Sequence, residues 1–405
     1  MENGPFRFLF ITADEFPPYR PDVEVLFGKE LLGRGYQIDW IMRAAGPDGP
    51  TGCVEWRGSR AWVAPTDPGE RRMDRLRKHL STLRNEMKIF SLLKSESYDF
   101  VQVKDKFLAA LMALLAARRA GIPCFYWLSF PYPEASLAMA KSPGARYPIF
   151  YWLRGLSFKL LLYGVICRLA DHIFVQSEEM KRVMATKGVP LKKMTAVPMG
   201  VDLEMLDNAG KLPRIELGSQ TVLYLGALDR LRQLEFLLEA FAVAVEDRQS
   251  VKLVFVGSSE EQADVDFLKS EVARLGLTEQ VVFMGFLPRE QALSYVRAAT
   301  ICVSPIPSNP VFDVASPTKI LEYMALAKPV VANDQPDQRQ VLEESGAGIC
   351  TPYDAGSFGK ALIRLLDHPE EAREMGARGR RYVKRTRTYA AIADTLEAHY
   401  VRLAK

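Results

Sequence analysis

Short strand-like runs alternate with helix-length segments along most of the chain, and this alternation restricts the fold more than any other feature of the sequence. In the second half each run precedes a segment long enough for a helix. These runs are Val222 to Leu225, Lys252 to Val256, Val281 to Met284, Ile301 to Ser304 and Pro329 to Ala332. Repeated β-α units predict a parallel sheet with helices on both of its faces.

The first half repeats the pattern, with runs at Phe6 to Thr12, Tyr36 to Met42, Phe100 to Lys104, Cys124 to Ser129 and His172 to Gln176. Between the halves, Gly200 to Gln220 contains glycines, Pro213 and charges but no sustained apolar period, which is typical of an interdomain connection. A length of 405 residues also suits two hydrophobic cores. We therefore predict two doubly wound α/β domains, at 1–205 and 215–385, with binding crevices at the carboxyl ends of their strands that face each other across a cleft.

Charge and cysteine content exclude several classes of function. The 53 basic residues are mixed with 49 acidic ones for a net charge of +4, so we expect no nucleic-acid partner. The 5 cysteines form no C-x-x-C pair, which favours reduced thiols in the cytoplasm. The 4 histidines are not paired at ligand spacing, so we expect no metal.

Targeting and cofactor motifs are also missing from the sequence. The N-terminus resembles a first strand and not a signal peptide. The apolar runs Phe107 to Ala117 and Leu160 to Cys167 are shorter than the ~20 residues that span a bilayer, so we expect no transmembrane segment. Neither G-x-G-x-x-G nor a P-loop is present, and we expect no cofactor.

The clearest chemical signal is a helix start in the second half, with the sequence Ser316-Pro317-Thr318-Lys319-Ile320-Leu321-Glu322. Ser316 suits the N-cap and Pro317 the first helical position. The free N–H groups of such a start favour phosphate, and Lys319 adds a positive charge in the first turn. Glu322 follows on the same face, at a distance that suits ribose hydroxyls. The segment predicts a site for a nucleotide diphosphate, and a capped surface helix is the alternative.

A second signal lies where three strand-like runs lead directly into Gly226, Gly257 and Gly285. Glycine at a strand end lets the backbone approach a ligand closely. Arg230 and Arg232 follow the first of these turns, and forked guanidinium groups can grip a diphosphate. Three such turns in one domain favour a nucleotide pocket, although a charged turn alone could also be solvated surface.

Several motifs then follow a familiar order over roughly residues 165 to 350. The helix start continues as Ser316-Pro317-x-Lys319-x-x-Glu322-Tyr323-Met324-Ala325-x-x-Lys328-Pro329-Val330-Val331-Ala332. Upstream stand Leu225-Gly226 through Arg232 to Ala240-Phe241, Ala170-Asp171 to Ser177, and Val197-Pro198-Met199-Gly200-Val201-Asp202. These motifs resemble those of the family 4 retaining glycosyltransferases, which have the GT-B fold of two Rossmann-like domains.

The resemblance implies a metal-independent enzyme that transfers a sugar, with retention, from a nucleotide-diphosphate sugar to a glycan or lipid-linked acceptor in polysaccharide or glycoconjugate biosynthesis. It implies that the first domain binds the acceptor and the second the donor. A C-terminal helix within 386–405 would return to the first domain. In such a transfer cationic groups stabilise the departing diphosphate, whose oxygen can itself take the acceptor proton, so that no separate base is needed.

The resemblance also assigns roles to single residues. Glu322 would contact the donor ribose, Arg232 the diphosphate, and the backbone near Phe286 and Leu287 the base. With Lys319, we predict Arg232 and Glu322 as the catalytic residues. The predicted donor-binding residues are Gly226, Arg230, Gly257, Phe286, Leu287, Asp313, Ser316, Pro317 and Thr318.

Four positions depart from the family pattern. Ala227 replaces the first phosphate arginine, for which Arg230 could substitute, and Val314 replaces a glutamate that contacts the sugar, with Asp313 adjacent. The histidine expected after the fourth strand is absent, which leaves Ser129 or Glu134 as acceptor-side candidates. The usual Gly-Gly acceptor loop is replaced by Pro21-Asp22-Val23, for which a plain surface loop is an alternative.

The segment from Tyr147 to Arg168 is rich in aromatic and aliphatic residues, with Arg154, Lys159 and Arg168 interspersed. Because these charges do not share one helical face, we predict burial against the first domain, with contact to a bilayer as the alternative. The basic segment Arg71 to Lys88 predicts a solvated helix that could also serve at an anionic membrane. The predicted location is therefore cytoplasmic, with peripheral contact to the inner face of the plasma membrane left open.

Two other functions remain as alternatives at this point. A sugar-nucleotide epimerase could use the same fold, because fold does not fix function. A catalytically weak sugar-nucleotide-binding or scaffold subunit would account for the departures at Ala227 and Val314. The presence of both Lys319 and Glu322 favours the transferase.

Overall fold

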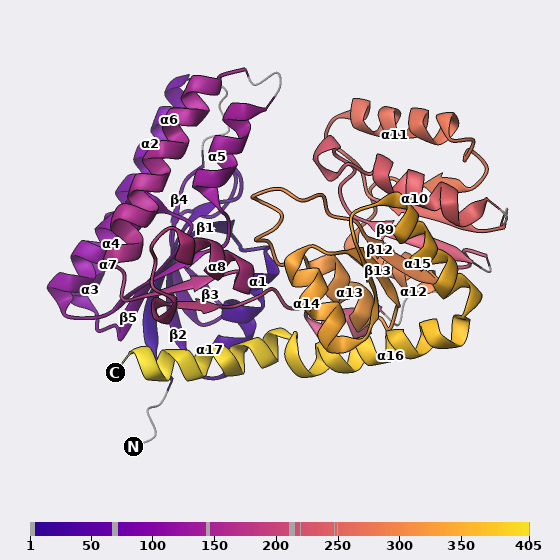
Figure 1. Ribbon diagram of the computed structural model, residues 1–405. Coiled ribbons are helices and arrows are strands. Elements are labelled where there is room, and N and C mark those ends of the chain that lie inside the picture. Colours follow the sequence, from indigo (N-terminus) through magenta and orange to yellow (C-terminus); the bar gives the residue numbers. More distant parts are fainter. Residues whose placement is uncertain are drawn as a thin grey trace. The chain divides into compact units, whose positions relative to one another are not determined.

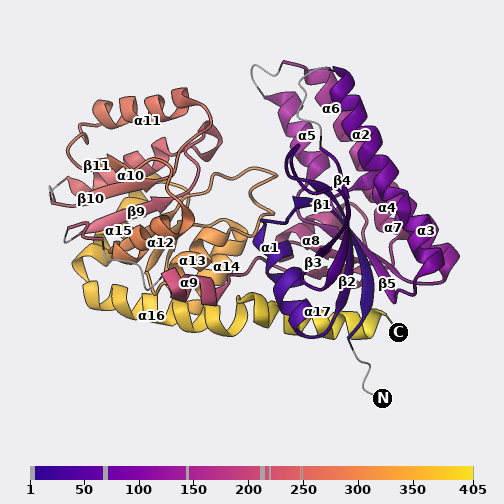
Figure 2. The ribbon, with the colours of Figure 1, turned by 180° about the vertical axis from the view of Figure 1, so that it is seen from behind.

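The structure is a computed structural model that describes residues 5–66, 72–142, 146–209, 215–218, 220–246, 248 and 250–404. The chain forms two compact units, which we call unit 1 (Met1–Pro198 with Tyr389–Lys405) and unit 2 (Met199–Thr388). Each unit has its own sheet with helices around it (Figures 1 and 2). The predicted α/β class with two doubly wound sheets is confirmed.

Unit 1 contains an eight-stranded sheet in the order β3-β4-β2-β1-β5-β6-β7-β8. Its pairs are parallel except for the antiparallel hairpin of β3 and β4. The strands are β1 (Arg7–Phe16), β2 (Gln37–Ala44), β3 (Gly52–Trp56), β4 (Ser59–Ala64), β5 (Phe100–Lys104), β6 (Cys124–Leu128), β7 (His172–Val175) and β8 (Met194–Ala196). Every residue of β5 and β6 is buried, as expected for strands covered on both faces.

The helices of unit 1 are α1 (Pro21–Glu24), η1 (Leu26–Leu31), α2 (Arg72–Glu86), α3 (Lys88–Ser95), α4 (Phe107–Ala120), α5 (Tyr132–Lys141), α6 (Pro148–Lys159), η2 (Leu160–Ile166), α7 (Cys167–Leu169), α8 (Glu178–Thr186), η3 (Leu191–Lys193) and α17 (Tyr389–Leu403). The last of these packs on the aromatic core of the sheet. The ring centroid of Tyr400 lies 4.8 Å from that of Phe100, and its hydroxyl donates to Gln102 Oε1 at 2.6 Å. The C-terminal segment therefore completes the core of unit 1.

Unit 2 contains a six-stranded parallel sheet in the order β11-β10-β9-β12-β13-β14. Its strands are β9 (Thr221–Leu225), β10 (Lys252–Val256), β11 (Val281–Phe283), β12 (Ile301–Ser304), β13 (Val330–Asn333) and β14 (Gly348–Thr351). The helices are α9 (Leu203–Ala209), η4 (Arg230–Arg232), α10 (Glu235–Val245), α11 (Gln262–Arg274), α12 (Arg289–Ala298), α13 (Thr318–Ala325), α14 (Pro336–Ser345), α15 (Ala355–Asp367) and α16 (Pro369–Thr386).

The strand orders place a topological switch point in each unit. In unit 2 the chain runs outward from β9 through β10 to β11, and then crosses to β12 on the other side of β9. In unit 1 the corresponding switch lies between β1 and β5. In open α/β sheets ligands bind beyond the carboxyl ends of the strands at such points. These two edges are therefore where each unit is expected to bind its ligand.

The structure corrects two expectations for unit 1. The alternative of a plain surface loop does not hold for the segment that begins Pro21-Asp22-Val23, which is a short helix in which Asp22 is 4% exposed and Val23 is 0% exposed. The prediction of burial for Tyr147 to Arg168 holds only for its last part, which contains the buried Leu162 and Ile166, whereas in α6 Gly155 is the buried residue and faces Leu137 of α5. The reason is that α6 packs through one narrow face and leaves the rest of its apolar surface open.

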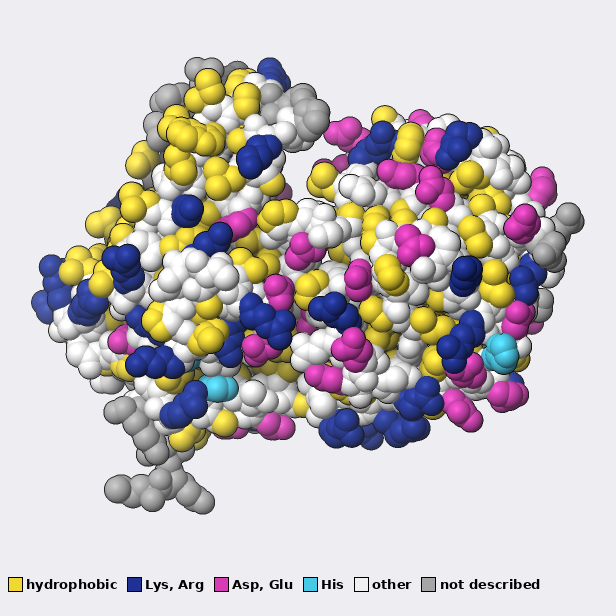
Figure 3. Space-filling model, viewed as in Figure 1, with side chains coloured by type: hydrophobic (Ala, Val, Ile, Leu, Met, Phe, Trp, Pro, Cys, Tyr) yellow, Lys and Arg dark blue, Asp and Glu magenta, His cyan; other side chains and the backbone are white. Residues whose placement is uncertain are grey.

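The helical stretch Pro148–Leu169 is long and apolar enough, by length and composition alone, to cross a membrane, and 22% of it is buried. Figure 3 shows the hydrophobic side chains that gather over α6. The exposed members are Tyr147, Ile149, Phe150, Trp152, Leu153, Leu156 and Leu160, which we call the α6 apolar face. Soluble proteins rarely expose so many neighbouring large apolar side chains without a binding role.

Candidate active site

Lys319 lies in the first turn of α13 and reaches across the switch point of unit 2 toward β9. Its Nζ donates to the hydroxyl of Tyr224 at 2.8 Å and lies 4.2 Å from the centre of that ring. Gly226 follows β9 at φ +149°, and a Cβ built there would stand 2.6 Å from the Lys319 Nζ. The backbone conformation at 226 therefore favours glycine, and a Cβ there would also require the end of the Lys319 side chain to shift.

The charge of Lys319 is sensitive to its surroundings. Burial, together with the smaller effect of the nearby guanidinium of Arg232, lowers the pKa of the ammonium to about 7, whereas Asp229 and Glu322 act in the opposite direction. A lysine with such a pKa is only partly protonated near neutral pH. A bound polyanion would raise the pKa again, so this site is suited to the binding of phosphate groups.

Glu322 lies one turn further along α13 and is 9% exposed. Its Oε1 accepts a hydrogen bond from the guanidinium of Arg289, at the start of α12, at 2.6 Å. Burial raises the pKa of Glu322, while Arg289 and Lys319 oppose that rise. Sequence reasoning missed Arg289, which stands 33 positions before the glutamate. The available signal was its position directly after Pro288, shortly after the glycine turn that follows a strand.

The glycine turns at the ends of β9, β10 and β11 are stacked on one another. Gly226 donates its N–H to Val256 O and Gly257 donates to Gly285 O, both at 2.9 Å. A Cβ at Gly257, which has φ +140°, would stand 1.9 Å from Gly226 O. Beyond them Phe286 is 77% exposed, and Leu287 packs partly against the core. The turns thus leave backbone atoms without side chains next to Lys319.

The two predicted phosphate arginines behave differently. Arg232 approaches the site, since its charge acts on Lys319. Among the described residues its buried Nε has no hydrogen-bond partner. This atom lies 3.6 Å from Asp229 Oδ2, and the guanidinium carbon lies 5.0 Å from the centre of the Phe312 ring. Arg230 instead stacks on Phe267 of α11, at 3.4 Å from the ring centre. The structure therefore brings Arg232 to Lys319 but turns Arg230 toward α11.

The predicted cap of α13 is wrong. The helix begins at Thr318 with Pro317 at the N-cap position, and no side chain caps it. Ser316 is 5% exposed; it donates to Asp337 Oδ2 at 2.8 Å and accepts from the Met199 N–H at 3.1 Å. Its hydroxyl therefore binds Asp337 and does not cap the helix. Asp337 is itself buried and held in place by an ion pair with Arg387 at 3.0 Å. The first N–H groups of α13 are thus left without a side-chain cap.

The loop before α13 is held by polar contacts. Asp313 accepts a hydrogen bond from the hydroxyl of Ser308 at 3.0 Å, and its N–H donates to Asn309 O at 2.9 Å. The amide of Gln335 donates to the carbonyls of Phe312 and Ala315, each at 2.9 Å. Next to Asp313, Val314 is 3% exposed. The carboxylate of Asp313 therefore sits in an ordered loop near the start of α13.

The two acceptor-side candidates in unit 1, Ser129 and Glu134, contact different residues. Ser129, 6% exposed, donates its hydroxyl to Asp105, whose Oδ1 also accepts the Ser129 N–H at 2.9 Å. Asp105 has φ +58°, and burial raises the pKa of its carboxyl against the opposing effect of Lys104. Glu134 accepts from the hydroxyl of Tyr163 at 2.9 Å, and its Oε2 is buried without a hydrogen-bond partner among the described residues.

A buried ionic cluster at the switch point of unit 1 was not foreseen from the sequence. Lys104, whose side chain is 1% exposed, donates to Asp22 at 2.6 Å and to Asp14 at 3.1 Å. Arg20 Nε lies 3.3 Å from Asp22 and 3.5 Å from Asp14. Burial alone would raise the pKa of Asp22, but Lys104 and Arg20 hold it below its ordinary value. A charged pair, Lys104-Asp105, at the end of a buried strand was the signal for this cluster.

Metal ligands do not gather anywhere in the part of the chain that the structure describes. No group of three or more His, Cys, Asp or Glu side chains could hold an ion there.

The chain matches solved structures that have the GT-B fold. Sucrose-phosphate synthase from Thermosynechococcus elongatus matches with a TM-score of 0.70 at 22% identity, over 98% of this chain and 99% of that one. The HepE protein of Anabaena, solved in complex with UDP, matches with a TM-score of 0.68 at 15% identity, over 98% of this chain and 100% of that one. The fold is therefore that of a GT-B protein.

Family models match both units. The model described as Glycosyltransferase Family 4 covers residues 25–205, and the model described as Glycosyl transferases group 1 covers residues 219–368. The chain belongs to the family 4 glycosyltransferases, as its motifs predicted.

The names of two relatives contain the name of a lipid. Phosphatidyl-myo-inositol mannosyltransferase of Mycobacterium leprae is 30% identical over 42% of this chain and 43% of that protein. Alpha-monoglucosyldiacylglycerol synthase of Streptococcus pneumoniae is 25% identical over 70% of this chain and 63% of that protein. The matched regions thus span 43% and 63% of the length of these two relatives.

Proposed function

We propose that the chain transfers a sugar, with retention and without a metal, from a nucleotide-diphosphate sugar bound by unit 2 to a glycan or lipid-linked acceptor. The observation that carries this proposal is the pairing of Lys319 and Glu322 on the first turns of α13, beside the bare backbone of Gly226. A cation and a carboxylate one turn apart match the phosphates and the ribose of a nucleotide diphosphate.

The charges of this site also suit the chemistry of transfer. When the bond between the sugar and the diphosphate breaks, negative charge builds up on the departing phosphate, and Lys319 and Arg232 lie where they would stabilise it. The uncapped N-terminus of α13 adds its dipole to the same effect. The acceptor hydroxyl forms the new bond to the sugar and gives its proton to the departing phosphate oxygen. Glu322, held by Arg289, would bind the ribose and take no part in proton transfer.

Two further features support the donor and the location within this proposal. The HepE protein has been solved with UDP, and we propose a nucleoside diphosphate of this kind for unit 2. The names of two relatives include lipids, and the exposed α6 apolar face is suited to the surface of a bilayer. We therefore propose that the chain works in the cytoplasm, in peripheral contact with the inner face of the plasma membrane.

A thermal-shift panel of UDP-, GDP- and ADP-sugars tests the donor site, because a ligand that binds only the folded state raises the melting temperature. We expect one nucleotide to raise it selectively and Glu322→Ala to abolish that rise. Glu290→Ala, an exposed change on α12, is the matched control and should keep the shift. If no nucleotide shifts the wild-type protein, the transferase proposal fails and a scaffold role becomes the better interpretation.

A further inference from the structure

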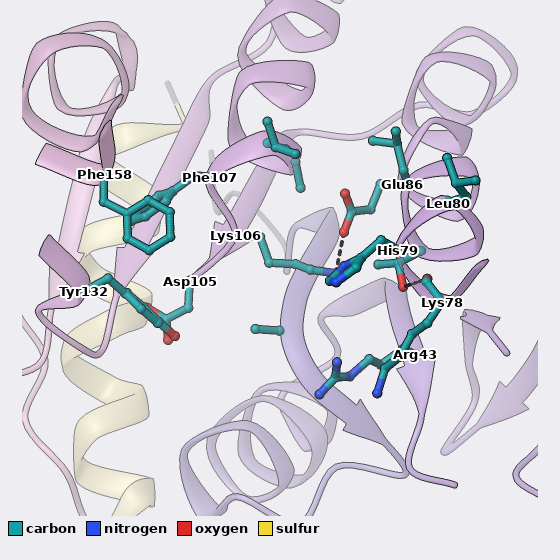
Figure 4. Close-up of a pocket in the computed structure, with 15 residues that line it drawn as sticks. Arg43, Lys78, His79, Leu80, Glu86, Asp105, Lys106, Phe107, Tyr132 and Phe158 are labelled. Carbon is teal, nitrogen blue, oxygen red and sulfur yellow. Dashed lines mark hydrogen bonds and ion pairs between the residues drawn. The ribbon is translucent and has the colours of Figure 1, made fainter. Parts of the chain in front are cut away.

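Unit 1 contains a cavity of 530 Å³ at its own switch point. Ala13 of β1, Arg43 of β2 and Asp105 at the end of β5 contribute to its lining, so the cavity lies beyond the carboxyl ends of these strands. Helices α2, α4, α5 and α6 supply the remaining walls (Figure 4). This is the position at which an α/β sheet of this kind binds a ligand.

One wall of the cavity is basic. Arg43, Lys78, His79 and Lys106 stand on this side in Figure 4. Arg43 pairs with Glu15 at 2.9 Å and Lys106 with Glu86 at 2.5 Å. Among the described residues Lys78 and His79 form no ion pair, so their donors remain available to an anion.

The opposite wall is aromatic and aliphatic. The ring of Phe107 lies 4.8 Å from that of Phe158 and 5.7 Å from that of Tyr132, in edge-on contacts. Leu108 also lines the cavity and is 61% exposed, so the apolar lining continues out to the surface. Phe158 belongs to α6, the helix that carries the exposed apolar face. The apolar wall thus reaches the surface at Leu108.

We propose that this cavity binds the acceptor and that the acceptor is a lipid with a phosphate ester in its head group. Lys78 and His79 bind the phosphate, and the hydrocarbon chain lies along Phe107 and Phe158 and leaves the cavity at Leu108. The two walls together favour a molecule that is anionic at one end and apolar at the other over a free sugar phosphate or a neutral glycan. This inference rests on the proposed function, whose acceptor class it names.

Binding of decyl phosphate to the full chain, measured by isothermal titration below its micelle concentration, tests the proposal. We expect saturable binding of one molecule per chain, with inorganic phosphate and decyl maltoside each at least about tenfold weaker, because each lacks one of the two interactions. Lys78→Ala combined with His79→Ala should weaken decyl phosphate binding about tenfold, through the loss of charged hydrogen bonds. Leu108→Ser should weaken it severalfold by the loss of apolar contact.

Matched variants elsewhere on unit 1 control for general charge and apolar effects. Lys187→Ala with Lys192→Ala removes two exposed positive charges that do not line the cavity, and Leu191→Ser removes an exposed leucine. Both should bind decyl phosphate like the wild type. Equal affinities in the cavity variants and the control variants would overturn the proposal, as would equal affinities for decyl phosphate and inorganic phosphate. Nucleotide binding by unit 2 is measured separately, so if the wild-type chain binds a nucleotide but does not bind decyl phosphate, the acceptor assignment alone is refuted.

Discussion

At the scale of single residues, the proposed donor site contains a lysine whose pKa lies close to neutral pH. Burial and Arg232 lower the pKa of Lys319 to about 7. The folded chain therefore binds fewer protons at this position than the unfolded chain between about pH 7 and the ordinary lysine pKa of 10.5. The free energy of unfolding therefore rises as the pH increases through this window. The destabilisation caused by the buried charge on Lys319 is complete below about pH 7.

Binding of a nucleotide diphosphate should therefore be coupled to proton uptake. Because the phosphates favour the charged ammonium, we expect uptake of up to about half a proton per bound nucleotide at pH 7. Titration calorimetry in two buffers with different ionisation enthalpies measures this number directly. Lys319→Met should abolish the uptake, whereas the exposed Lys269→Met should leave it unchanged. Uptake that persists in Lys319→Met would assign the proton to another group.

Gly226 provides a second residue-scale prediction. Gly226→Ala places a Cβ 2.6 Å from the Lys319 Nζ and forces a non-glycine residue to φ +149°. We expect a loss of ~1–3 kcal/mol in the free energy of unfolding and at least a tenfold loss of nucleotide affinity. In the control, Gly356→Ala, the new methyl would find its nearest neighbour at 3.5 Å, an ordinary contact. Urea unfolding and nucleotide titration of both variants would test this, and wild-type behaviour of Gly226→Ala would contradict it.

Sequence patterns predicted some of these residues and not others, for a physical reason. Lys319 and Glu322 share a helix, and helical periodicity places them on one face. The partners Arg289 and Glu322 are 33 positions apart, and Lys104 and Asp22 are 82 apart. Such pairs form only when β-α units assemble side by side, so no local sequence pattern predicts them.

At the scale of elements, the strands that were predicted best are those buried on both faces. β5, β10 and β12 have the predicted ends, and nearly all of their residues are buried. The hairpin of β3 and β4 was not predicted, since every residue of β3 is exposed or half-buried and its five residues form no apolar run. The prediction for α6 failed because its apolar residues extend around the helix, and the sequence does not reveal which of them find a partner within the unit.

The α6 apolar face gives an element-scale prediction. Ile149 is 74% exposed and Leu153 is 55% exposed, so their replacement by serine should leave the melting temperature within about 2 °C of the wild type. The same double change should reduce co-sedimentation with anionic liposomes severalfold, because it removes apolar area that would enter the bilayer interface. Leu191→Ser is the control for an exposed leucine elsewhere in unit 1. Unchanged sedimentation of the α6 variant would argue against membrane contact through this face.

Helix α17 gives another prediction at this scale. Tyr400 is 0% exposed, packs on Phe100 and donates to Gln102. Tyr400→Ala should lower the free energy of unfolding of unit 1 by ~3–5 kcal/mol, since it removes a large buried ring. The exposed Thr395→Ala on the same helix should cost less than about 1 kcal/mol. Denaturant unfolding followed by the fluorescence of the buried Trp40 and Trp127 reports on this unit; equal effects of the two variants would contradict the packing described for α17.

At the scale of the whole molecule, each unit contributes one half of the proposed reaction. In the proposal, Lys319, Arg232 and the glycine turns of unit 2 bind a nucleotide diphosphate. The cavity of unit 1, with one basic and one apolar wall, would bind a lipid phosphate. The two halves can be tested independently, because their binding residues lie in separate units of the chain.

The most direct test of the central claim is transfer itself. Purified chain would be incubated with a bacterial lipid extract and UDP-, GDP- or ADP-sugars carrying a labelled sugar, and the lipid fraction would be analysed for label and for the anomeric configuration of the new bond. We predict that one nucleotide sugar labels a lipid with the configuration of the donor and that Glu322→Ala lowers the rate by at least about a hundredfold, whereas Glu290→Ala does not. Labelling at the same rate in Glu322→Ala, or no labelled lipid with any donor although the nucleotide binds, would contradict the account.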